Sequence, residues 1–412
     1  MKKQINKKNI SAFLMILFLS WGNFQIAGLY FFLIFQILYC FCSYFYNKGK
    51  LYFSKSALIN SLFIFLVLST ISGALTNLPS SFKKYSLVMT IVLMPSYFAY
   101  TYFLQDCKNN AFYFEKAIQI LKIGFLIQII YLPIQFLIYK VLKTDLNSII
   151  FSKILHLMDN PTFYRQGEYF PSAFVWHSAV LAPMLVISFL LFKNIWIKAL
   201  ILLDAFICGN NTALIGVILT LIFSVLYFVL KENAKINKKF LMGIMILLLI
   251  SIIFISTTKG QELVYTKILH LINRIFNVNS DSSSSAHLSY YTLYPQIVEK
   301  NGCFTALFGT GYASSGFSIT SINGQYSSLR HWVVESDIID ILVSRGILGF
   351  ISYYFFLLVI ALKGMKIDYR YLIVITVIII QGITYNVQFE YVFFIELLMF
   401  GSIKLKKNFF TI

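Results

Sequence analysis

Residues 57–77 read ALINSLFIFLVLSTISGALTN, a stretch without a single charged side chain. A helix needs about 20 predominantly apolar residues to cross the hydrocarbon core of a membrane, so this stretch predicts a transmembrane helix. Similar runs recur along all 412 residues, and only 12% of the chain is charged, against about 25% in soluble domains. The sequence therefore predicts an all-α polytopic membrane protein with one transmembrane domain over residues 1–412.

The apolar runs predict about twelve transmembrane helices and two long external loops. The predicted helices are residues 10–23, 26–45, 57–77, 85–104, 117–139, 172–192, 195–209, 212–230, 240–257, 337–362, 371–386 and 389–403. The predicted external loops are approximately residues 140–171 and 258–336. In the second loop, residues 261–276 and 286–301 have apolar positions at helical spacing, so we expect short amphipathic helices there.

Lysines fall mainly on one set of connections between these helices. The short connections on the opposite side hold only Lys83 and Lys84. Because cytoplasmic loops carry the excess of basic residues, both termini are predicted to be cytoplasmic and both long loops to lie outside the cytoplasmic (inner) membrane. The formal net charge of +18 is then explained by lysines near the inner membrane surface and requires no nucleic acid.

Arginine is distributed differently from lysine. The chain has 29 lysines but five arginines, and four of these lie in or beside the predicted external loops: Arg165, Arg274, Arg330 and Arg345. A guanidinium binds phosphate or carboxylate through two parallel hydrogen bonds, which lysine cannot do. The four arginines are therefore candidate ligands for an anionic substrate. Two alternatives stay open: chance accounts for so small a set, and Arg165, among tyrosines and phenylalanines, also suits a lipid-headgroup anchor.

A group of ionisable residues precedes the apolar helix in LRHWVVESDIIDILVSRGILGF (329–350). His331 and Glu335 are candidate bases, since the pKa of histidine lies near ambient pH. Asp337 is the third candidate catalytic residue. The alternatives are that the acids favour the positive N-terminal end of the helix and that His331 is an ordinary surface histidine.

Glycines mark a turn in LFGTGYASSG (307–316). Gly309 and Gly311 permit close approach of the backbone to a ligand, although plain turn chemistry explains them as well. The chain has no cysteine and histidine pattern typical of a metal site and no phosphate-binding glycine loop followed by lysine, so neither a metal nor a cofactor is expected. Asp204 lies within a predicted helix, where it either has a function or pairs with Lys122 or neighbouring helices.

A GTGY turn, a polar stretch, then His-x3-Glu-Ser-Asp and SRGILGF at the start of a transmembrane helix resemble the bacterial O-antigen and capsular polysaccharide polymerases. The related O-antigen ligases share this layout. YRQGEYFPSAF (164–174) resembles an earlier Arg/Gly/Pro segment of the family, and the predicted topology is similar too.

The resemblance implies a membrane glycosyltransferase that joins polyprenyl-diphosphate-linked oligosaccharide repeats at the outer face of the membrane. It implies catalytic roles for His331, Glu335 and Asp337. It implies binding of diphosphate or glycan by Arg165, Arg274, Arg330, Arg345, Gly309 and Gly311. Besides this substrate and membrane lipids, the expected partners are a flippase and a chain-length regulator.

Three other functions stay open. The first is an O-antigen ligase that transfers finished glycan to a lipid or protein acceptor, and the acidic Glu335 and Asp337 after His331 favour a polymerase over it. The second is a flippase or transporter of lipid-linked oligosaccharide, which is expected to have pseudo-symmetric halves and charges lining a midplane cavity. The third is a structural membrane protein. The single large external loop and the few midplane charges favour an enzyme.

Overall fold

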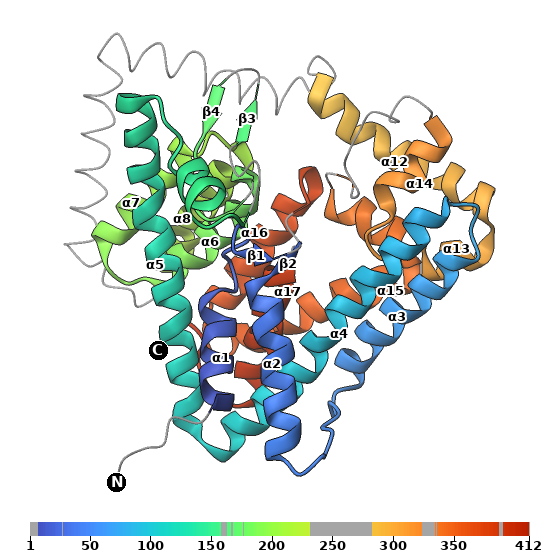
Figure 1. The fold of residues 1–412 in the computed structure, drawn as a ribbon, viewed down its shortest axis with the longest axis horizontal. Coiled ribbons are helices and arrows are strands. Elements are labelled where there is room, and N and C mark those ends of the chain that lie inside the picture. Colours follow the sequence, from blue (N-terminus) through green and yellow to red (C-terminus); the bar gives the residue numbers. More distant parts are fainter. Residues whose placement is uncertain are drawn as a thin grey trace. The chain divides into compact units, whose positions relative to one another are not determined.

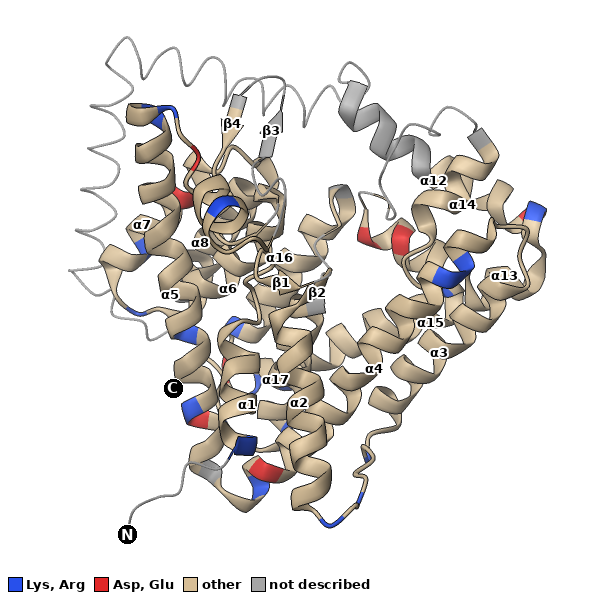
Figure 2. Cartoon of the chain, in the orientation of Figure 1, with Lys and Arg blue, Asp and Glu red and all other residues tan. Residues whose placement is uncertain are grey.

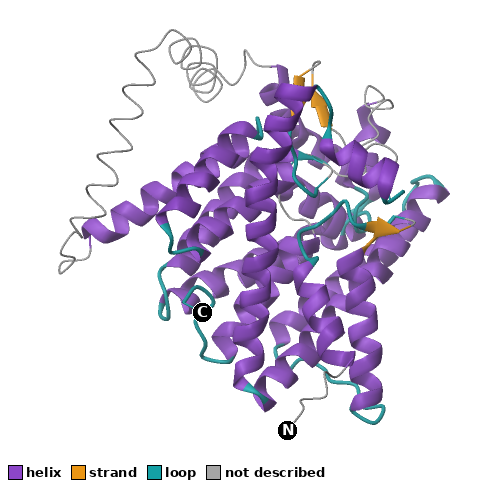
Figure 3. Cartoon of the chain, turned by 60° about the vertical axis from the view of Figure 1, so that its left-hand side comes forward, coloured by secondary structure: helices purple, strands orange, loops and turns teal. Residues whose placement is uncertain are grey.

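The computed structural model is mostly helical, with two short β-hairpins (Figures 1 and 3). It describes residues 7–26, 28–157, 163–165, 168–175, 177–230, 282–323, 334, 336–386 and 390–411. The chain divides into two compact units, the first formed by Met1–Thr220 with Leu293–Ile412 and the second by Leu221–Thr292. In the second unit, the described residues are the end of one helix and the start of another. The candidate site lies within the first unit.

The helices account for most of the described chain. In chain order they are α1 (Lys7–Leu17), α2 (Phe31–Tyr46), α3 (Ala57–Ala74), α4 (Ser80–Asn109), α5 (Ala111–Leu142), α6 (Leu181–Leu191), α7 (Ile195–Ile207), α8 (Asn211–Leu230), α12 (Ser282–Asn301), α13 (Cys303–Phe308), α14 (Ser315–Asn323), α15 (Asp337–Met365), α16 (Arg370–Thr384) and α17 (Glu390–Lys404). The antiparallel hairpins are β1 (Gln25–Ile26) with β2 (Leu29–Tyr30), and β3 (Phe163–Arg165) with β4 (Glu168–Phe170). A π-helical turn covers Ser148–Ile154 and a 3-10 turn covers Ser178–Val180.

Four of the described helices are long and apolar enough to cross a membrane: α3, α4, α5 and α15. The other predicted spans in the described chain are helices of 11 to 20 residues. An 11-residue helix is only about 16 Å long, roughly half the thickness of the hydrocarbon core. The predicted helix 240–257 and the amphipathic segment 261–276 lie outside the described residues. The helical class is therefore confirmed, whereas twelve crossings remain a prediction.

The core of the first unit includes two helices that are buried all round. All 11 residues of α6 are buried, and so are residues 391–402 of α17. The hydroxyl of Tyr391 donates a hydrogen bond to the carbonyl of Val180, which joins the start of α17 to the start of α6. A helix that is apolar on every face is expected inside a protein or a membrane, in agreement with this position.

The predicted helix 172–192 begins only at the 3-10 turn over Ser178–Val180, because two side chains hold the preceding segment in another conformation. Oε1 of Gln135 accepts a hydrogen bond from the N–H of Ala173 at 2.9 Å, and Nδ2 of Asn147 donates to the carbonyl of Ala173 at 2.6 Å. Ala173 itself has a φ of 50°. Both partners are distant in sequence, so the local apolar pattern predicted a helix that starts too early.

Ion pairs join connections that the charge pattern predicted to be cytoplasmic. Nζ of Lys8 lies 2.7 Å from Oδ1 of Asp106, which links α1 to the end of α4. Nζ of Lys407 lies 2.7 Å from Oε1 of Glu115, which links the C-terminal residues to the start of α5. Figure 2 shows that charged residues are more frequent at helix ends and in connections than within the helices.

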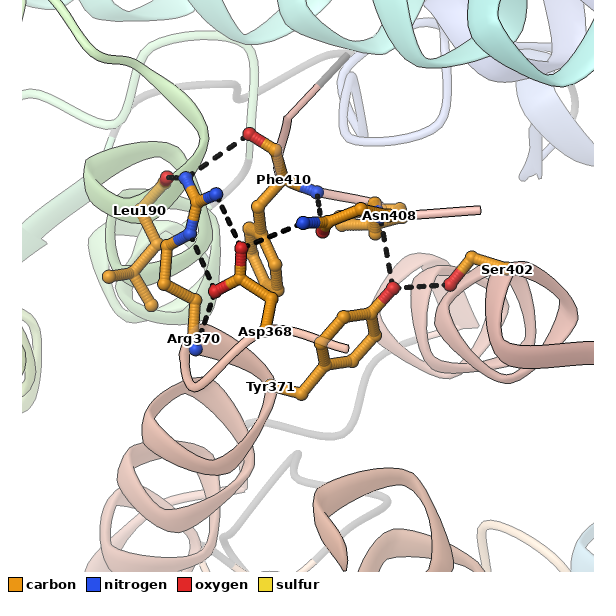
Figure 4. A network of polar contacts seen from close by, with 8 residues as sticks. Leu190, Asp368, Arg370, Tyr371, Ser402, Asn408 and Phe410 are labelled. Carbon is orange, nitrogen blue, oxygen red and sulfur yellow. Dashed lines mark hydrogen bonds and ion pairs between the residues drawn. The ribbon is translucent and has the colours of Figure 1, made fainter. Parts of the chain in front are cut away.

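A hydrogen-bond network fixes the C-terminal residues against α6 and the start of α16 (Figure 4). The carboxylate of Asp368 accepts from Nε of Arg370 at 2.9 Å, from its Nη2 at 2.6 Å and from Nδ2 of Asn408 at 2.8 Å. Nη1 of Arg370 also donates to the carbonyls of Leu190 and Phe410, each at 3.1 Å. The connection after α15, the end of α6 and the C-terminal residues therefore lie together.

Candidate functional site

The candidate site is built around a break in α15 at Gly346. This residue has φ 68° and ψ −177°, a conformation essentially restricted to glycine. The break divides α15 into a first segment, residues 337–345, and a second segment, residues 347–365. It also deprives the last carbonyls of the first segment of their helical N–H donors. Backbone groups at membrane depth need partners within the protein, so other donors must replace them.

The turn over residues 309–311 supplies those donors. The N–H of Thr310 donates to the carbonyl of Val343 at 2.8 Å, and the N–H of Gly311 donates to the carbonyl of Ser344 at 3.1 Å. Oγ1 of Thr310 adds a further hydrogen bond to the carbonyl of Val343 at 3.1 Å. The GTGY and SRG motifs, which are well separated in the sequence, therefore pair through their backbones.

Close packing explains the glycines of this turn. A Cβ atom on Gly309 would lie 2.4 Å from backbone atoms of Ser344 and Arg345. A Cβ atom on Gly311 would lie 2.5 Å from Oγ of Ser86 in α4. The space that a side chain would need at either position is occupied by the protein itself, so packing within the fold is sufficient to require both glycines.

Ser315 connects the site to Asp340. Its Oγ donates a hydrogen bond to Oδ1 of Asp340 and accepts one from the N–H of Val334 at 3.0 Å. Val334 belongs to the His-x3-Glu-Ser-Asp motif, and Asp340 lies in the first segment of α15. This chain of hydrogen bonds attaches the motif to the start of α14 and to α15.

Arg345, the last residue of the first segment, lies between two tyrosine rings. Its Cζ is 5.0 Å from the centroid of Tyr312, in the GTGY turn, and 6.0 Å from that of Tyr353, in the second segment. A guanidinium within about 6 Å of an aromatic face is attracted by the ring. The Nε atom of Arg345 is buried and has no hydrogen-bond partner in the described part of the chain. The rings therefore contact a cation that has a donor unused by any described residue.

Tyr353 is in turn bound to Glu396 of α17. The tyrosine hydroxyl lies 3.0 Å from Oε1 and 3.1 Å from Oε2 of the carboxylate. Only 2% of Tyr353 and 1% of Glu396 are exposed. A polar pair in such a position is stable only because each group satisfies the other.

Two buried carboxyl groups interact with this arginine, and a third interacts with one of them. Asp340 and Glu396 both interact electrostatically with Arg345, and Asp337 interacts with Glu396. Asp337 also packs against α16, where a Cβ atom on Gly382 would lie 2.8 Å from its Oδ2. As the first residue of α15, Asp337 is at the end where the helix dipole favours a negative charge, so this alternative to a catalytic role stays open.

His177 connects the earlier motif segment to the same group of residues. Its Nδ1 accepts a hydrogen bond from the N–H of Ala179 at 3.0 Å and lies 3.4 Å from the hydroxyl of Tyr385. The His177 and Tyr385 rings are stacked with centroids 6.0 Å apart. Asn386, the next residue, is hydrogen-bonded to Asp340. The two motif segments are therefore linked through the end of α16.

The structure places some of the predicted site residues and not others. It describes Arg345, Gly309 and Gly311, which lie at the break in α15, and Asp337, which is the first residue of that helix. Arg165 is the last residue of β3, and its backbone is in register with Glu168 of β4, but its side chain lies outside the described atoms. Four predicted residues lie outside the described residues altogether: Arg274, Arg330, His331 and Glu335.

Asp204 makes no hydrogen bond to this group among the described residues. It is fully buried in α7, and neither carboxylate oxygen has a hydrogen-bond partner in the described part of the chain. The predicted hydrogen bonds to neighbouring helices or to Lys122 are therefore not formed there.

Sequence reasoning missed several members of the site. They are Tyr312, Tyr353, Tyr385 and Asn386, whereas Asp340 and Glu396 stood out in the sequence as ionisable residues but were given no role. Asp340 had a readable signal, because it lies one helical turn after Asp337 and therefore shares its face. Tyr353 had none, since the chain has 27 tyrosines, and the only signal of Glu396 was its position as an ionisable residue within the last predicted helix.

The described residues contain no group of three or more histidine, cysteine, aspartate or glutamate side chains able to hold a metal ion. No protein-family model matches the chain, and no curated protein matches it in sequence.

Proposed function

We propose that the protein is a polysaccharide polymerase that joins polyprenyl-diphosphate-linked oligosaccharide repeats at the outer face of the cytoplasmic membrane. The observation that carries this proposal is Arg345, a guanidinium whose Nε has no partner in the described part of the chain, which contacts two aromatic rings and interacts electrostatically with Asp340. A glycosyl transfer from a diphosphate carrier needs a cation for the leaving group and a base for the attacking hydroxyl. Both kinds of group are present at the break in α15.

In the proposed reaction, a hydroxyl of the carrier-linked acceptor repeat attacks the anomeric carbon of the growing chain. The glycosidic C–O bond forms while the bond from the anomeric carbon to the diphosphate oxygen breaks. The electron pair of that bond leaves with the polyprenyl diphosphate, and the hydroxyl proton passes to the base. The negative charge that develops on the diphosphate is stabilised by guanidinium groups, which form two parallel hydrogen bonds to phosphate.

Each residue is assigned a role in this proposal from its position. Arg345 binds the diphosphate, and the predicted ligands Arg165, Arg274 and Arg330 complete the cationic surroundings. The candidate bases are His331, Glu335 and Asp337, to which we add Asp340. Ion pairs join both ends of the chain to the connection between α4 and α5, so both termini are proposed to lie on one side, which the excess of lysine assigns to the cytoplasm.

The size distribution of cell-surface polysaccharide in a deletion strain tests the proposal. The strain is complemented with wild type, Arg345→Ala, Arg345→Lys or Lys84→Ala, and protein amounts are matched by immunoblot. We expect single repeats in the deletion strain, a full ladder with wild type and with the exposed-cation control Lys84→Ala, and no ladder with Arg345→Ala. Arg345→Lys should restore the ladder poorly, because lysine lacks the bidentate geometry.

Other size distributions of the polysaccharide would indicate a different function. Long chains that accumulate on the polyprenyl carrier in the deletion strain would identify a ligase. An unchanged profile in that strain would contradict both enzymes and favour a transporter. A full ladder with Arg345→Ala would leave the class of enzyme standing and remove Arg345 from the site.

A further inference from the structure

We infer that Glu396 is a positioning residue for Arg345 and acts through the hydroxyl of Tyr353. The inference rests on the proposed function and extends the site to the last helix, α17. It follows from the contacts of three buried or half-buried side chains that lie on separate parts of the fold.

Because α15 is broken at Gly346, contacts with other side chains are needed to fix the position of the Arg345 side chain. Arg345 ends the first segment of α15 and Tyr353 lies in the second, and the regular helical hydrogen bonds are interrupted between them. The backbone of the second segment therefore does not by itself fix the direction of the Arg345 side chain. Its position depends on the two rings, Tyr312 at 5.0 Å and Tyr353 at 6.0 Å.

Glu396 determines where one of those rings lies. Because the Tyr353 hydroxyl is within 3.1 Å of both carboxylate oxygens, the ring is tethered to α17 at its far end. A ring fixed at both ends presents its face to Arg345 in one orientation, whereas a ring without the hydroxyl contact is free to tilt. In its ionised form, Glu396 also interacts electrostatically with the guanidinium. The hydrogen bond and the charge can be separated by substitution.

Three variants separate the effect of the hydrogen bond from the effect of the charge. Tyr353→Phe keeps the ring and removes the tether, and Glu396→Gln keeps an acceptor of the same size and removes the charge. Tyr371→Phe is the control, because the hydroxyl of buried Tyr371 likewise contacts α17, at Ser402 (2.5 Å), and it also accepts a hydrogen bond from the N–H of Phe409 at 3.0 Å. Ser402 lies six residues beyond Glu396, or about 9 Å along the helix, so the control removes a similar contact at a distance from Arg345.

The activity test uses purified full-length protein in proteoliposomes, with lipid-linked repeats extracted from the deletion strain as substrate. Arg345 is proposed to bind a diphosphate that is charged in the ground state and gains charge in the transition state, so its misplacement should raise KM and also lower kcat. We expect KM to rise about tenfold in Tyr353→Phe and to stay within about twofold of wild type in Glu396→Gln, which keeps the tether. Tyr371→Phe should have the wild-type KM.

A second readout requires no turnover. Phenylglyoxal modifies accessible guanidinium groups, and mass spectrometry reports its rate of reaction at Arg345. We expect this rate to rise several-fold in Tyr353→Phe and to be unchanged in Tyr371→Phe, with similar unfolding midpoints for the two variants.

The outcomes are distinguishable. If wild type forms no polymer from the lipid-linked repeats, the proposed function fails, and the modification rates alone decide whether Tyr353 positions Arg345. If wild type is active but Tyr353→Phe matches Tyr371→Phe in KM and in modification rate, the pair only anchors α15 to α17 and the inference is wrong. If Glu396→Gln raises KM and Tyr353→Phe does not, the charge and not the tether positions the arginine, and the inference is wrong.

Discussion

Two glycines at the ends of α13 allow steric packing to be separated from backbone strain. Gly302 has φ 84° and ψ 174°, and Gly309 has φ 83° and ψ −175°, so an alanine is equally strained at both positions. A Cβ atom on Gly302 meets nothing within 4 Å, whereas one on Gly309 meets the α15 backbone. We expect Gly302→Ala to cost ~1–3 kcal/mol from strain alone, and Gly309→Ala to cost roughly 1–3 kcal/mol more from overpacking. Chemical denaturation in detergent measures both, and equal losses would contradict the packing argument.

The carboxylate of Asp368 gives the C-terminal network a defined pH dependence. Burial raises the pKa of Asp368, but hydrogen bonds from Arg370 and Asn408 outweigh it, so the pKa lies below its ordinary value. A group with a lowered folded-state pKa stabilises the protein above its unfolded pKa, about 3.9 for aspartate, and this stabilisation is lost as the pH falls through the folded value. Asp368→Asn should therefore lose roughly 2 kcal/mol at neutral pH.

Unfolding midpoints of wild type and Asp368→Asn between pH 3 and pH 7 check this prediction. The difference should be constant down to about pH 5 and shrink below about pH 4. Glu115→Gln, which removes a half-exposed ion pair with Lys407, should have little effect at any pH. A difference that grew on acidification would show that the sign is wrong.

At the residue scale, the sequence predicted which kinds of chemical group the site contains. It was less able to predict which individual residues form the site. Arg345 could be found because arginine is scarce in this chain and lysine is the ordinary cation. Its neighbours Tyr312 and Tyr353 could not, because a tyrosine beside a guanidinium has the same local pattern as one in a hydrophobic core. Which tyrosine faces the arginine depends on the break in α15 and on α17, and these are tertiary features.

Among the elements, apolar runs located the helices but not their ends. A helix-forming pattern continues through SRGILGF, so the sequence predicted one uninterrupted helix over 337–362. The structure starts a helix at the same residue and breaks it at Gly346. Glycine alone does not predict a break, since Gly349, three residues later, lies within regular helix. The difference is the turn at residues 309–311, which satisfies the carbonyls exposed at Gly346.

The late start of the helix after β4 yields a prediction about α5. Gln135→Leu removes the acceptor for the N–H of Ala173, which is completely buried. A buried donor left without a partner costs roughly 1–3 kcal/mol, so the unfolding free energy in detergent should fall by that amount. Gln119→Leu changes an exposed glutamine of the same helix and should be close to neutral. Similar effects for the two substitutions would show that the hydrogen bond does not stabilise the segment.

For the whole molecule, the lysine distribution predicts which side of the membrane each connection faces. Cys303 is exposed at the start of α13, in the predicted external region, and Lys50 is exposed in the connection between α2 and α3. In intact cells, a chain with Cys303 as its only cysteine should react with a membrane-impermeant maleimide. A chain with Lys50→Cys as its only cysteine should react only after permeabilisation. Labelling of the second variant in intact cells would reverse the predicted orientation.

The membrane class was predictable because it depends on composition, which is a property of the whole chain. The arrangement was not, because helices such as α6 are buried on every face and their sequences do not indicate their neighbours. The sequence motifs identified part of the candidate site, because the structure places these motifs next to each other. The pairing of residues 309–311 with the break in α15 brings those motifs together.

The break in α15 also has a consequence for membrane insertion during synthesis. The first segment, residues 337–345, is only about 13 Å long, and its terminal carbonyls would be unpaired in lipid. Their donors are in the turn at residues 309–311, which leaves the ribosome before α15 does. The turn has therefore already been synthesised when α15 leaves the ribosome. The broken helix reaches its final depth in the membrane by packing against this turn. For this segment, integration into the bilayer and tertiary folding are one step.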